Sequence, residues 1–243
     1  MSRLVCGVQP VREAIRTLGS KLERVVVEAN GADPSPQLDA IARYAGDHGA
    51  HVERLARAEL DRMARGVRHQ GAIAFAPELA LASLDDLPLG SAALIVALDE
   101  VQDPQNFGAV IRSAVSMGAT AVVWPEHRSA PLSPATFRAS AGAVEHATLC
   151  RVSSLPAALT SLRERRVFVV GLDMAAAATI DRVDLVRPVA LVVGAEGKGL
   201  RKTVKRACDA LAKLPMPGPI DSLNASAAVA IALYEVVRQR LAR

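Results

Sequence analysis

Residues 92–98 (AALIVAL) decide the fold class, because their apolar side chains follow one another without a polar interruption. A strand with one solvent-facing side alternates between apolar and polar residues, whereas a strand buried on both faces of a parallel sheet does not. A second run of this kind, VALVV at 189–193, ends at Gly194. The two runs predict buried strands of an open α/β sheet.

Strand-like and helix-like segments alternate around these two runs. This alternation over residues 91–243 predicts one α/β domain with a parallel sheet. We expect its further strands at 121–124, 148–152, 167–172 and 211–214, its helices at 107–117, 155–165 and 223–241, and a loop that becomes helical over 128–140.

The first 78 residues predict a separate, smaller α/β domain. Its opening, MSRLVCGVQPVREAIR, is charged and helix-like, without the apolar centre of a signal peptide. Residues 79–90 contain prolines and acidic residues without strong periodicity, which predicts a linker. We expect helices at 10–18, 37–48 and 57–63, and strands at 24–29, 51–55 and 71–75.

Composition narrows the functional classes. Hydrophobic residues make up 51% of the 243 residues, enough for a packed core, and aromatic residues only 3%, which argues against stacking of successive bases on a row of rings. No apolar run approaches the roughly 18 residues of a membrane span. The three cysteines lie far apart and match neither a disulfide framework nor a zinc site. We therefore expect a cytoplasmic protein with inert thiols and no membrane association.

Three polar loops follow predicted strands, where open α/β sheets bind their ligands. They span 99–112, 194–200 and 215–226. The second loop, GAEGKGL, has neither the glycine spacing of a dinucleotide site nor the Ser or Thr that a P-loop needs after its lysine. This mismatch disfavours a nicotinamide-dependent oxidoreductase.

The first and third loops carry polar residues that suit helix starts. Asn106 is expected to cap a helix that begins near Phe107, and Ser222 or Asn224 to cap the last helix. Capping accounts for only part of the polar cluster Asp221, Ser222, Asn224 and Ser226.

Three long motifs in these loops resemble those of the SpoU/TrmH family of RNA 2′-O-ribose methyltransferases, in the SPOUT superfamily. They are LDEVQDPQNFGAVIRSAVSMGAT at 98–120, LVVGAEGKGL at 191–200 and LPMPGPIDSLNASAAVAIALYE at 214–235. GVQPVREAI at 7–15 and RHQGAIAF at 68–75 also look like the substrate-binding domain of the RlmB-type ribosomal RNA branch. Gln9 departs from this pattern, because relatives often have His there.

The resemblance implies a fold, a cofactor and a site. The expected fold is a parallel α/β sheet flanked by helices with a C-terminal trefoil knot, whose loops bind S-adenosylmethionine without a metal. The cofactor would contact Gly194, Ala195, Leu214, Met216, Ser222 and Leu223. The catalytic set would be Asn106, Arg112, Glu196, Ser222 and Asn224. The family is dimeric, so we expect a homodimer in which Arg112 faces the partner's cofactor.

The implied activity is methylation of a ribose 2′-hydroxyl in 23S ribosomal RNA, of guanosine by analogy with the RlmB-type branch. A tRNA ribose methyltransferase, a ribosomal RNA enzyme that confers antibiotic resistance, and a catalytically silent RNA-binding or assembly factor remain alternatives. Clustered basic residues, which can equally form solvated faces, are the expected RNA contacts: Lys198, Arg201, Lys202 and Lys205 after the glycine loop, and Arg65 and Arg68 in the first domain.

Overall fold

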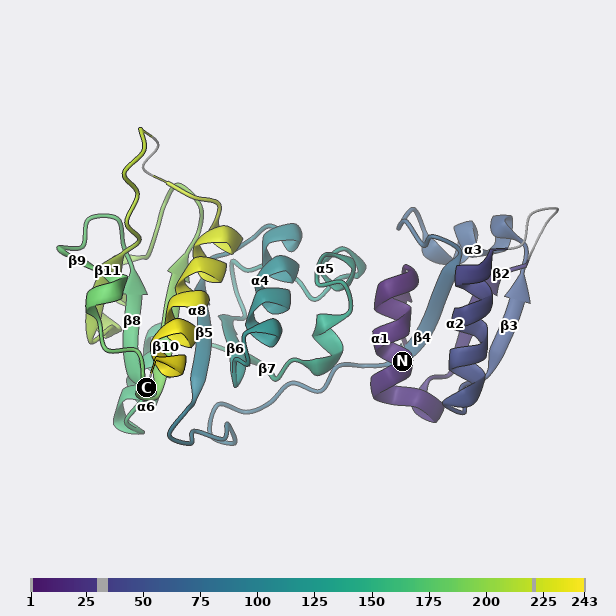
Figure 1. The fold of residues 1–243 in the computed structure, drawn as a ribbon, viewed down its shortest axis with the longest axis horizontal. Helices are drawn as coiled ribbons and strands as arrows, with labels where there is room; N and C mark the ends of the chain where they lie inside the picture. The colour runs from purple at the N-terminus through teal and green to yellow at the C-terminus, as the bar shows by residue number, and fades with distance from the viewer. Residues whose placement is uncertain (1, 30–34, 220–221, 243) are drawn as a thin grey trace. The chain divides into compact units, whose positions relative to one another are not determined.

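The computed structural model describes residues 2–29, 35–219 and 222–242, which form two compact units (Figure 1). Unit 1 comprises Met1–Ala80 and Leu132–His146, and unit 2 comprises Leu81–Pro131 and Ala147–Arg243. The chain therefore passes between the units three times, after residues 80, 131 and 146.

Unit 2 is built on a parallel sheet of seven strands in the order β7-β6-β5-β10-β8-β11-β9. The two apolar runs form its centre, as predicted. The strands are β5 (Leu94–Asp99), β6 (Ala121–Pro125), β7 (Leu149–Val152), β8 (Phe168–Leu172), β9 (Ala178–Thr179), β10 (Val189–Gly194) and β11 (Ala210–Lys213).

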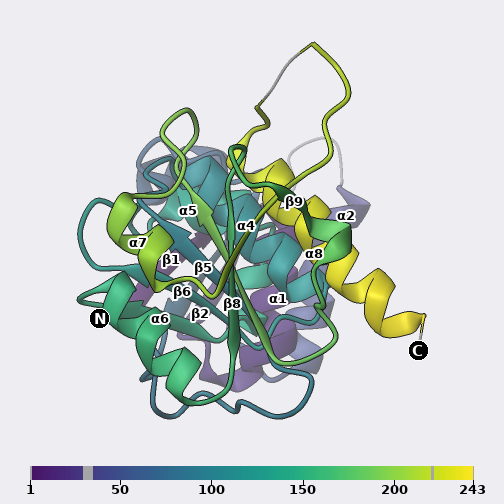
Figure 2. The same cartoon turned by 90° about the vertical axis from the view of Figure 1, so that its left-hand side faces the viewer.

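Helices cover both faces of this sheet, which explains why residues 94–98 of β5 and 189–193 of β10 are apolar throughout. Figure 2 shows α6 and α7 on one side of β8 and α8 on the other. Alternate strand residues such as Ile95 and Ala97 pack on α6 and α7, while α8 packs on α4 and β10. The bounds are α4 (Pro104–Ser116), α6 (Leu155–Glu164), α7 (Lys202–Ala207) and α8 (Ala225–Leu241).

The strand order changes direction between β5 and β10, which are adjacent although about 90 residues separate them. Asp99 and Gly194 are register partners at the carboxyl ends of these strands. The loops that follow β5 and β10 therefore leave the sheet side by side, at the switch point where such sheets bind ligands.

Unit 1 contains a four-stranded sheet in the order β1-β4-β2-β3, in which only β2 and β3 are parallel. Helices α1 and α2 pack over one face around Val25 and Val27, and α3 packs over the other around Val26. The elements are β1 (Ser2–Cys6), α1 (Val8–Leu18), β2 (Arg24–Glu28), α2 (Pro36–Asp47), β3 (Val52–Leu55), α3 (Arg57–Ala64) and β4 (Ala72–Pro77), with α5 (Pro134–Ala139) and a 3-10 helix (Ala143–His146) joining from the later segment.

The later segment is attached to unit 1 by a nearly buried ion pair. Both terminal nitrogens of Arg3 donate to the Glu145 carboxylate, its Nε donates to the Pro77 carbonyl, and its guanidinium lies 5.3 Å from the centre of the Phe137 ring. Residues 132–146 were expected within the second domain. Their contacts with Arg3 place them in unit 1.

Local expectations differ from the structure at three further places. Residues 2–6 of the helix-like opening form the strand β1, which pairs with β4, and the helix α1 begins only at Val8. Asn106 does not cap α4, because Asp103 accepts hydrogen bonds from the backbone N–H groups of Gln105 and Asn106. The expected linker packs against unit 2: Leu87 is buried in its core, and Arg165 donates to the Leu84 and Leu87 carbonyls.

None of the helices in the described ranges is long and apolar enough to cross a membrane. Asp221 of the predicted polar cluster lies outside the described residues. The trefoil knot implied by the family resemblance stays a prediction.

Candidate active site

Three predicted catalytic residues from three separate loops meet in unit 2. Nδ2 of Asn224 donates to Oδ1 of Asn106 at 2.8 Å and lies 3.4 Å from Oε2 of Glu196. Asn106 is in the first turn of α4, Glu196 follows β10, and Asn224 precedes α8. These residues, which we call the polar trio, are brought together by adjacent strand ends and by the packing of α4 on α8.

The backbone at the start of α8 orients the polar trio. Asn224 is the N-cap residue, and its Oδ1 accepts from the backbone N–H and the hydroxyl of Ser226 at 2.9 and 2.6 Å. Because this oxygen is held at the helix start, the amide nitrogen of Asn224 must point at Asn106 and Glu196. Asn106 then accepts through Oδ1, so its own NH₂ group remains a donor for a ligand.

A cavity of about 160 Å³ is lined in part by Glu196 of the polar trio. Its walls combine apolar side chains, including Leu172 and Val193, with the charged side chains of Asp173 and Lys213. We call it the loop cavity. All six predicted cofactor contacts line it: Gly194, Ala195, Leu214, Met216, Ser222 and Leu223.

Gly194 is required by the close approach of two backbone segments at this cavity. A Cβ atom on Gly194 would lie 2.2 Å from the carbonyl carbon of Gly199 and 2.6 Å from the backbone nitrogen of Leu200. The glycine loop folds back directly over the end of β10, and only glycine leaves room for it.

A second hollow is lined in part by Asn106 and Glu196 of the polar trio. Its lining includes Gln102, Asp103 and Lys198, and it shares Ala195, Glu196 and Ala225 with the loop cavity. We call it the outer hollow. Glu196 therefore belongs to the wall between two adjoining sites, one of which also contains Asn106.

Arg112 does not join the polar trio within one subunit. It is exposed on α4, lines neither the loop cavity nor the outer hollow, and makes no hydrogen bond or ion pair with the described residues. Ser222, the fifth predicted catalytic residue, lines the loop cavity.

Two of the basic residues predicted to contact RNA form ion pairs with acidic side chains of the protein. Arg201 donates through Nε to the fully buried carboxylate of Asp99, and Lys205 pairs with Asp173. Lys198 and Lys202 are exposed and form no ion pair with the described residues. In unit 1, Arg65 and Arg68 are exposed, and Arg65 has a φ of 47° at the end of α3.

Asp173 is a polar residue of the site that sequence reasoning missed. Burial raises the pKa of its carboxyl group, but hydrogen bonds from Lys205 and the Ala175 backbone, together with the Lys205 charge, outweigh burial and lower that pKa. The available signal was its position directly after the predicted strand 167–172. The sequence did not show that β8 lies beside β10, so Asp173 could not be assigned to the site.

No group of three or more His, Cys, Asp or Glu side chains suited to a metal ion occurs in the described ranges 2–29, 35–219 and 222–242.

Comparison with protein families assigns both parts of the chain. A model of the SpoU rRNA methylase family matches residues 93–234, which include the polar trio and the loop cavity. A model described as RNA 2′-O ribose methyltransferase substrate binding matches residues 4–81.

Individual relatives agree with this assignment. An uncharacterized tRNA/rRNA methyltransferase of Mycolicibacterium gilvum is 38% identical over 98% of this chain and 77% of its own length. The SpoU methyltransferase AviRb of Streptomyces viridochromogenes, solved with the cofactor AdoMet (S-adenosylmethionine), is 25% identical, with a TM-score of 0.80 and coverage of 100% of this chain and 92% of its own. An AdoMet-bound rRNA methyltransferase from Sinorhizobium meliloti is 29% identical, with a TM-score of 0.77 and coverage of 98% and 87%. The chain belongs to the SpoU family of RNA methyltransferases.

Proposed function

We propose that the protein transfers a methyl group from S-adenosylmethionine to a ribose 2′-hydroxyl of 23S ribosomal RNA, with guanosine as the target nucleoside. The observation that carries the proposal is that Glu196, held by Asn224 beside Asn106, lines both the loop cavity and the outer hollow. Two reactants bound in adjoining sites that share lining residues can be held in line for transfer between them.

The loop cavity suits the cofactor. S-adenosylmethionine combines a flat purine with a charged amino acid, and the cavity combines apolar walls with Asp173 and Lys213. The backbone approach at Gly194 supplies a cradle that any side chain would fill. We therefore assign Gly194, Ala195, Leu214, Met216, Ser222 and Leu223 to cofactor binding.

The outer hollow is the proposed place of the target ribose. When bound, S-adenosylmethionine supplies an electrophilic methyl group, so the protein has to make a weakly acidic hydroxyl reactive. The NH₂ group of Asn106 can donate to the ribose oxygen, and the Glu196 carboxylate is placed to accept the hydroxyl proton. Asn224 orients both groups, and Ser222 orders the loop ahead of α8.

Arg112 is assigned to a site shared between subunits. A guanidinium keeps its proton above about pH 12, so we give Arg112 the role of stabilising negative charge on the ribose oxygen and clamping the neighbouring phosphate. Its exposed position on α4, outside both sites of its own subunit, supports action on the partner's site. The exposed apolar residues Ile231, Tyr234 and Leu241 on α8, which packs on α4, support a homodimer.

Mixing two inactive variants tests this arrangement. Arg112→Ala removes the proposed cation, and Gly194→Val blocks the loop cavity. In a mixed dimer one site retains both features, so activity should return on mixing. Sedimentation should show a dimer. If demonstrably mixed dimers recovered no activity, Arg112 would not act on the partner's site, and it would act on the site of its own subunit or have no catalytic role.

We assign residues 1–78 to RNA binding, residues 79–90 to the connection, and residues 91–243 to catalysis, apart from the 132–146 segment, which belongs to unit 1. Lys198, Lys202, Arg65 and Arg68 have no acidic partner among the described residues and are the better phosphate contacts. Arg201 and Lys205, predicted with them, are held by Asp99 and Asp173. Lys202→Ala should therefore lower the salt dependence of RNA binding by about one contact, and Lys205→Ala by less.

The substrate-binding unit favours ribosomal RNA over tRNA, because tRNA relatives more often carry short terminal extensions than a separate domain of this size. Mapping of ribose methylation in total RNA, with and without the gene, tests the proposal. We expect one 23S guanosine to lose its methyl group and to regain it with the wild-type gene but not with Asn224→Asp. Loss at a tRNA position would select the tRNA alternative, and no change at any position would favour a silent binding factor.

A further inference from the structure

Unit 1 contains a cavity of about 720 Å³ that the proposed catalytic chemistry does not use. It lies where the parallel strands β2 and β3 end. Glu28 and Ala29 form one wall, Arg57 at the start of α3 forms a second, and the turn of residues 66–70 closes a third. We call it the unit 1 cavity.

The turn that closes the cavity is rigidly built around His69, which is only 4% exposed. The backbone N–H of Gly71 donates to Nδ1 of His69 at 3.0 Å, so this nitrogen carries no proton. Nε2 therefore carries the proton and donates to Oδ1 of Asp61 at 2.9 Å. Gly71 has a φ of 79°, and its backbone carbonyl accepts from Glu28, which fastens the turn to β2. The wall is thus formed before any ligand binds.

The lining has the mixed chemistry that suits a nucleobase. Leu38 and Val67 provide apolar surface for a flat ring, and the Gln70 amide offers both a donor and an acceptor. Glu28 and Asp61 add carboxylate acceptors, so a polyphosphate would be repelled.

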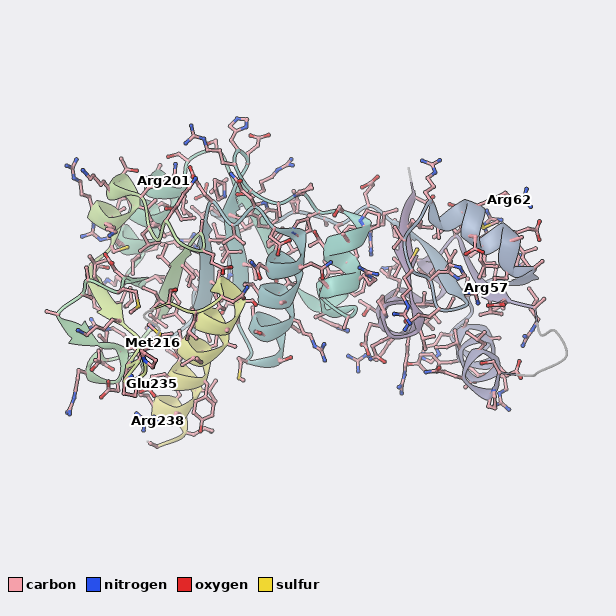
Figure 3. The ribbon with its side chains drawn as sticks, turned by 90° about the horizontal axis from the view of Figure 1, so that it is seen from above. Arg57, Arg62, Arg201, Met216, Glu235 and Arg238 are labelled. Carbon is pink, nitrogen blue, oxygen red and sulfur yellow. The ribbon has the colours of Figure 1, made fainter. Side chains whose placement is uncertain are left out.

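The two arginines that line the cavity differ in whether they form an ion pair. Arg57 pairs with Glu28 at 3.3 Å, while Arg68 forms no ion pair in the part of the chain that the structure describes. Figure 3 labels Arg57 and Arg62 on α3, and of these two only Arg57 lines the cavity. Arg68 is therefore the cation placed for one phosphate beside a bound base.

We infer that the unit 1 cavity binds one unpaired nucleotide of the RNA substrate, with the base against Gln70 and its phosphate on Arg68. A base within a duplex is stacked and paired, whereas a base in a loop or bulge can turn outward into such a cavity. The inference rests on the proposed function for its ligand, because it takes the substrate to be RNA.

Two RNA probes distinguish binding of a base in the cavity from binding of RNA to a basic surface. One is a hairpin with a randomised seven-nucleotide loop, and the other is a fully paired duplex with the same stem. Binding to the full chain is followed by fluorescence anisotropy over a range of salt concentrations. Gln70→Gly removes the amide and tolerates the φ of 53° at this position. Arg68→Ala removes the cation, and Arg43→Ala on α2, exposed and outside the cavity, is the matched control.

Gln70→Gly should weaken binding of the looped hairpin about tenfold, leave duplex binding unchanged and leave the salt dependence unchanged. Arg68→Ala should weaken hairpin binding and lower the salt slope by about one contact. Loops selected by the wild-type chain should show a base preference at one position, and Gln70→Gly should abolish it. Circular dichroism and thermal unfolding of each variant confirm that the fold is intact.

Equal effects of Gln70→Gly on both probes, or no effect on either, would overturn the inference. Neither result would contradict the proposed methyl transfer, because that proposal is tested separately by mapping ribose methylation. If the wild-type chain bound neither probe at low salt, the inference would fall. A positive methylation map would then place RNA recognition in unit 2.

Discussion

The fully buried carboxylate of Asp99 accepts hydrogen bonds from the backbone N–H of Arg201 at 2.8 Å and from its Nε at 2.7 Å. Asp99 ends β5, and Arg201 follows the glycine loop that leaves β10. The loop of residues 195–200 is therefore held at both ends: Gly194 lies in the sheet at its start, and Asp99 binds Arg201 at its end. Glu196 of the polar trio lies within this closed loop.

Arg201→Ala should destabilise the protein by about 3 kcal/mol, because it leaves a buried carboxylate without its cation. Urea unfolding followed by circular dichroism measures the loss. Arg206→Ala removes an exposed arginine from α7 and should stay within about 0.5 kcal/mol of wild type. Equal stability of the two variants would contradict a structural role for the Asp99–Arg201 pair.

Gly194→Ala should abolish measurable cofactor binding, because its methyl group would lie 2.2 Å from the backbone of Gly199 and push the glycine loop away. Isothermal titration calorimetry with S-adenosylhomocysteine provides the measurement. Gly218→Ala is the control, since a Cβ atom there meets nothing within 4 Å. Wild-type affinity in Gly194→Ala would show that the loop cavity is not the cofactor site.

Substitutions of Asn224 should separate helix capping from catalysis. Asn224→Asp keeps the oxygen that caps α8 but loses the NH₂ group that binds Asn106 and faces Glu196. We expect near wild-type stability with at least a hundredfold lower turnover. Asn224→Ala should lose the same activity and a further ~1 kcal/mol of stability. Full activity in Asn224→Asp would remove the polar trio from the mechanism.

Arg112→Ala should reduce single-turnover methyl transfer about 100- to 1,000-fold with little change in the binding of either substrate. Lysine should restore little, because a point charge does not reproduce the planar fork of the guanidinium. Ser116→Ala, one turn further along the exposed face of α4, is the matched control. More than about a tenth of the wild-type rate would exclude Arg112 from catalysis.

The three thiols should be unreactive in the folded protein and should make it less stable at alkaline pH. Burial raises the pKa of Cys6 to about 11 and that of Cys208 to about 12, and it also raises the pKa of Cys150. Unfolded thiols ionise near pH 8.5, so their contribution is intact below that pH and declines as the pH rises toward the folded values. Ellman's reagent should therefore react fully only after unfolding, and the free energy of unfolding should fall between pH 8 and 10. A Cys-free variant should show a smaller decline.

Local pattern predicted much of unit 2. The apolar runs at 92–98 and 189–193 became β5 and β10, and the three polar loops became the walls of the two sites. This succeeded because carboxyl ends of parallel strands share one edge of a sheet, so a loop's position follows from the strand before it.

The unpredicted features depend on partners distant in sequence. Arg3 and Glu145 are 142 residues apart, and Arg201 and Asp99 are 102 apart. A basic residue has the same local signature whether it faces RNA or a buried carboxylate, so Arg201 was grouped with the RNA contacts. For Arg112, whose proposed partner lies on another subunit, only the family resemblance indicated a role, because no local pattern distinguishes it from a solvated surface arginine.

Because residues 132–146 pack in unit 1, the two parts of the protein cannot be separated by a single cut in the chain. In the sequence, the substrate-binding part resembles an independent N-terminal domain. Its packing, however, is completed by a segment that lies within the methyltransferase half of the chain. A cut after residue 80 would leave Arg3 without Glu145 in one fragment and α5 without its strand in the other. Exchange of RNA specificity between relatives by swapping the first 80 residues therefore requires that the 132–146 segment be exchanged with them.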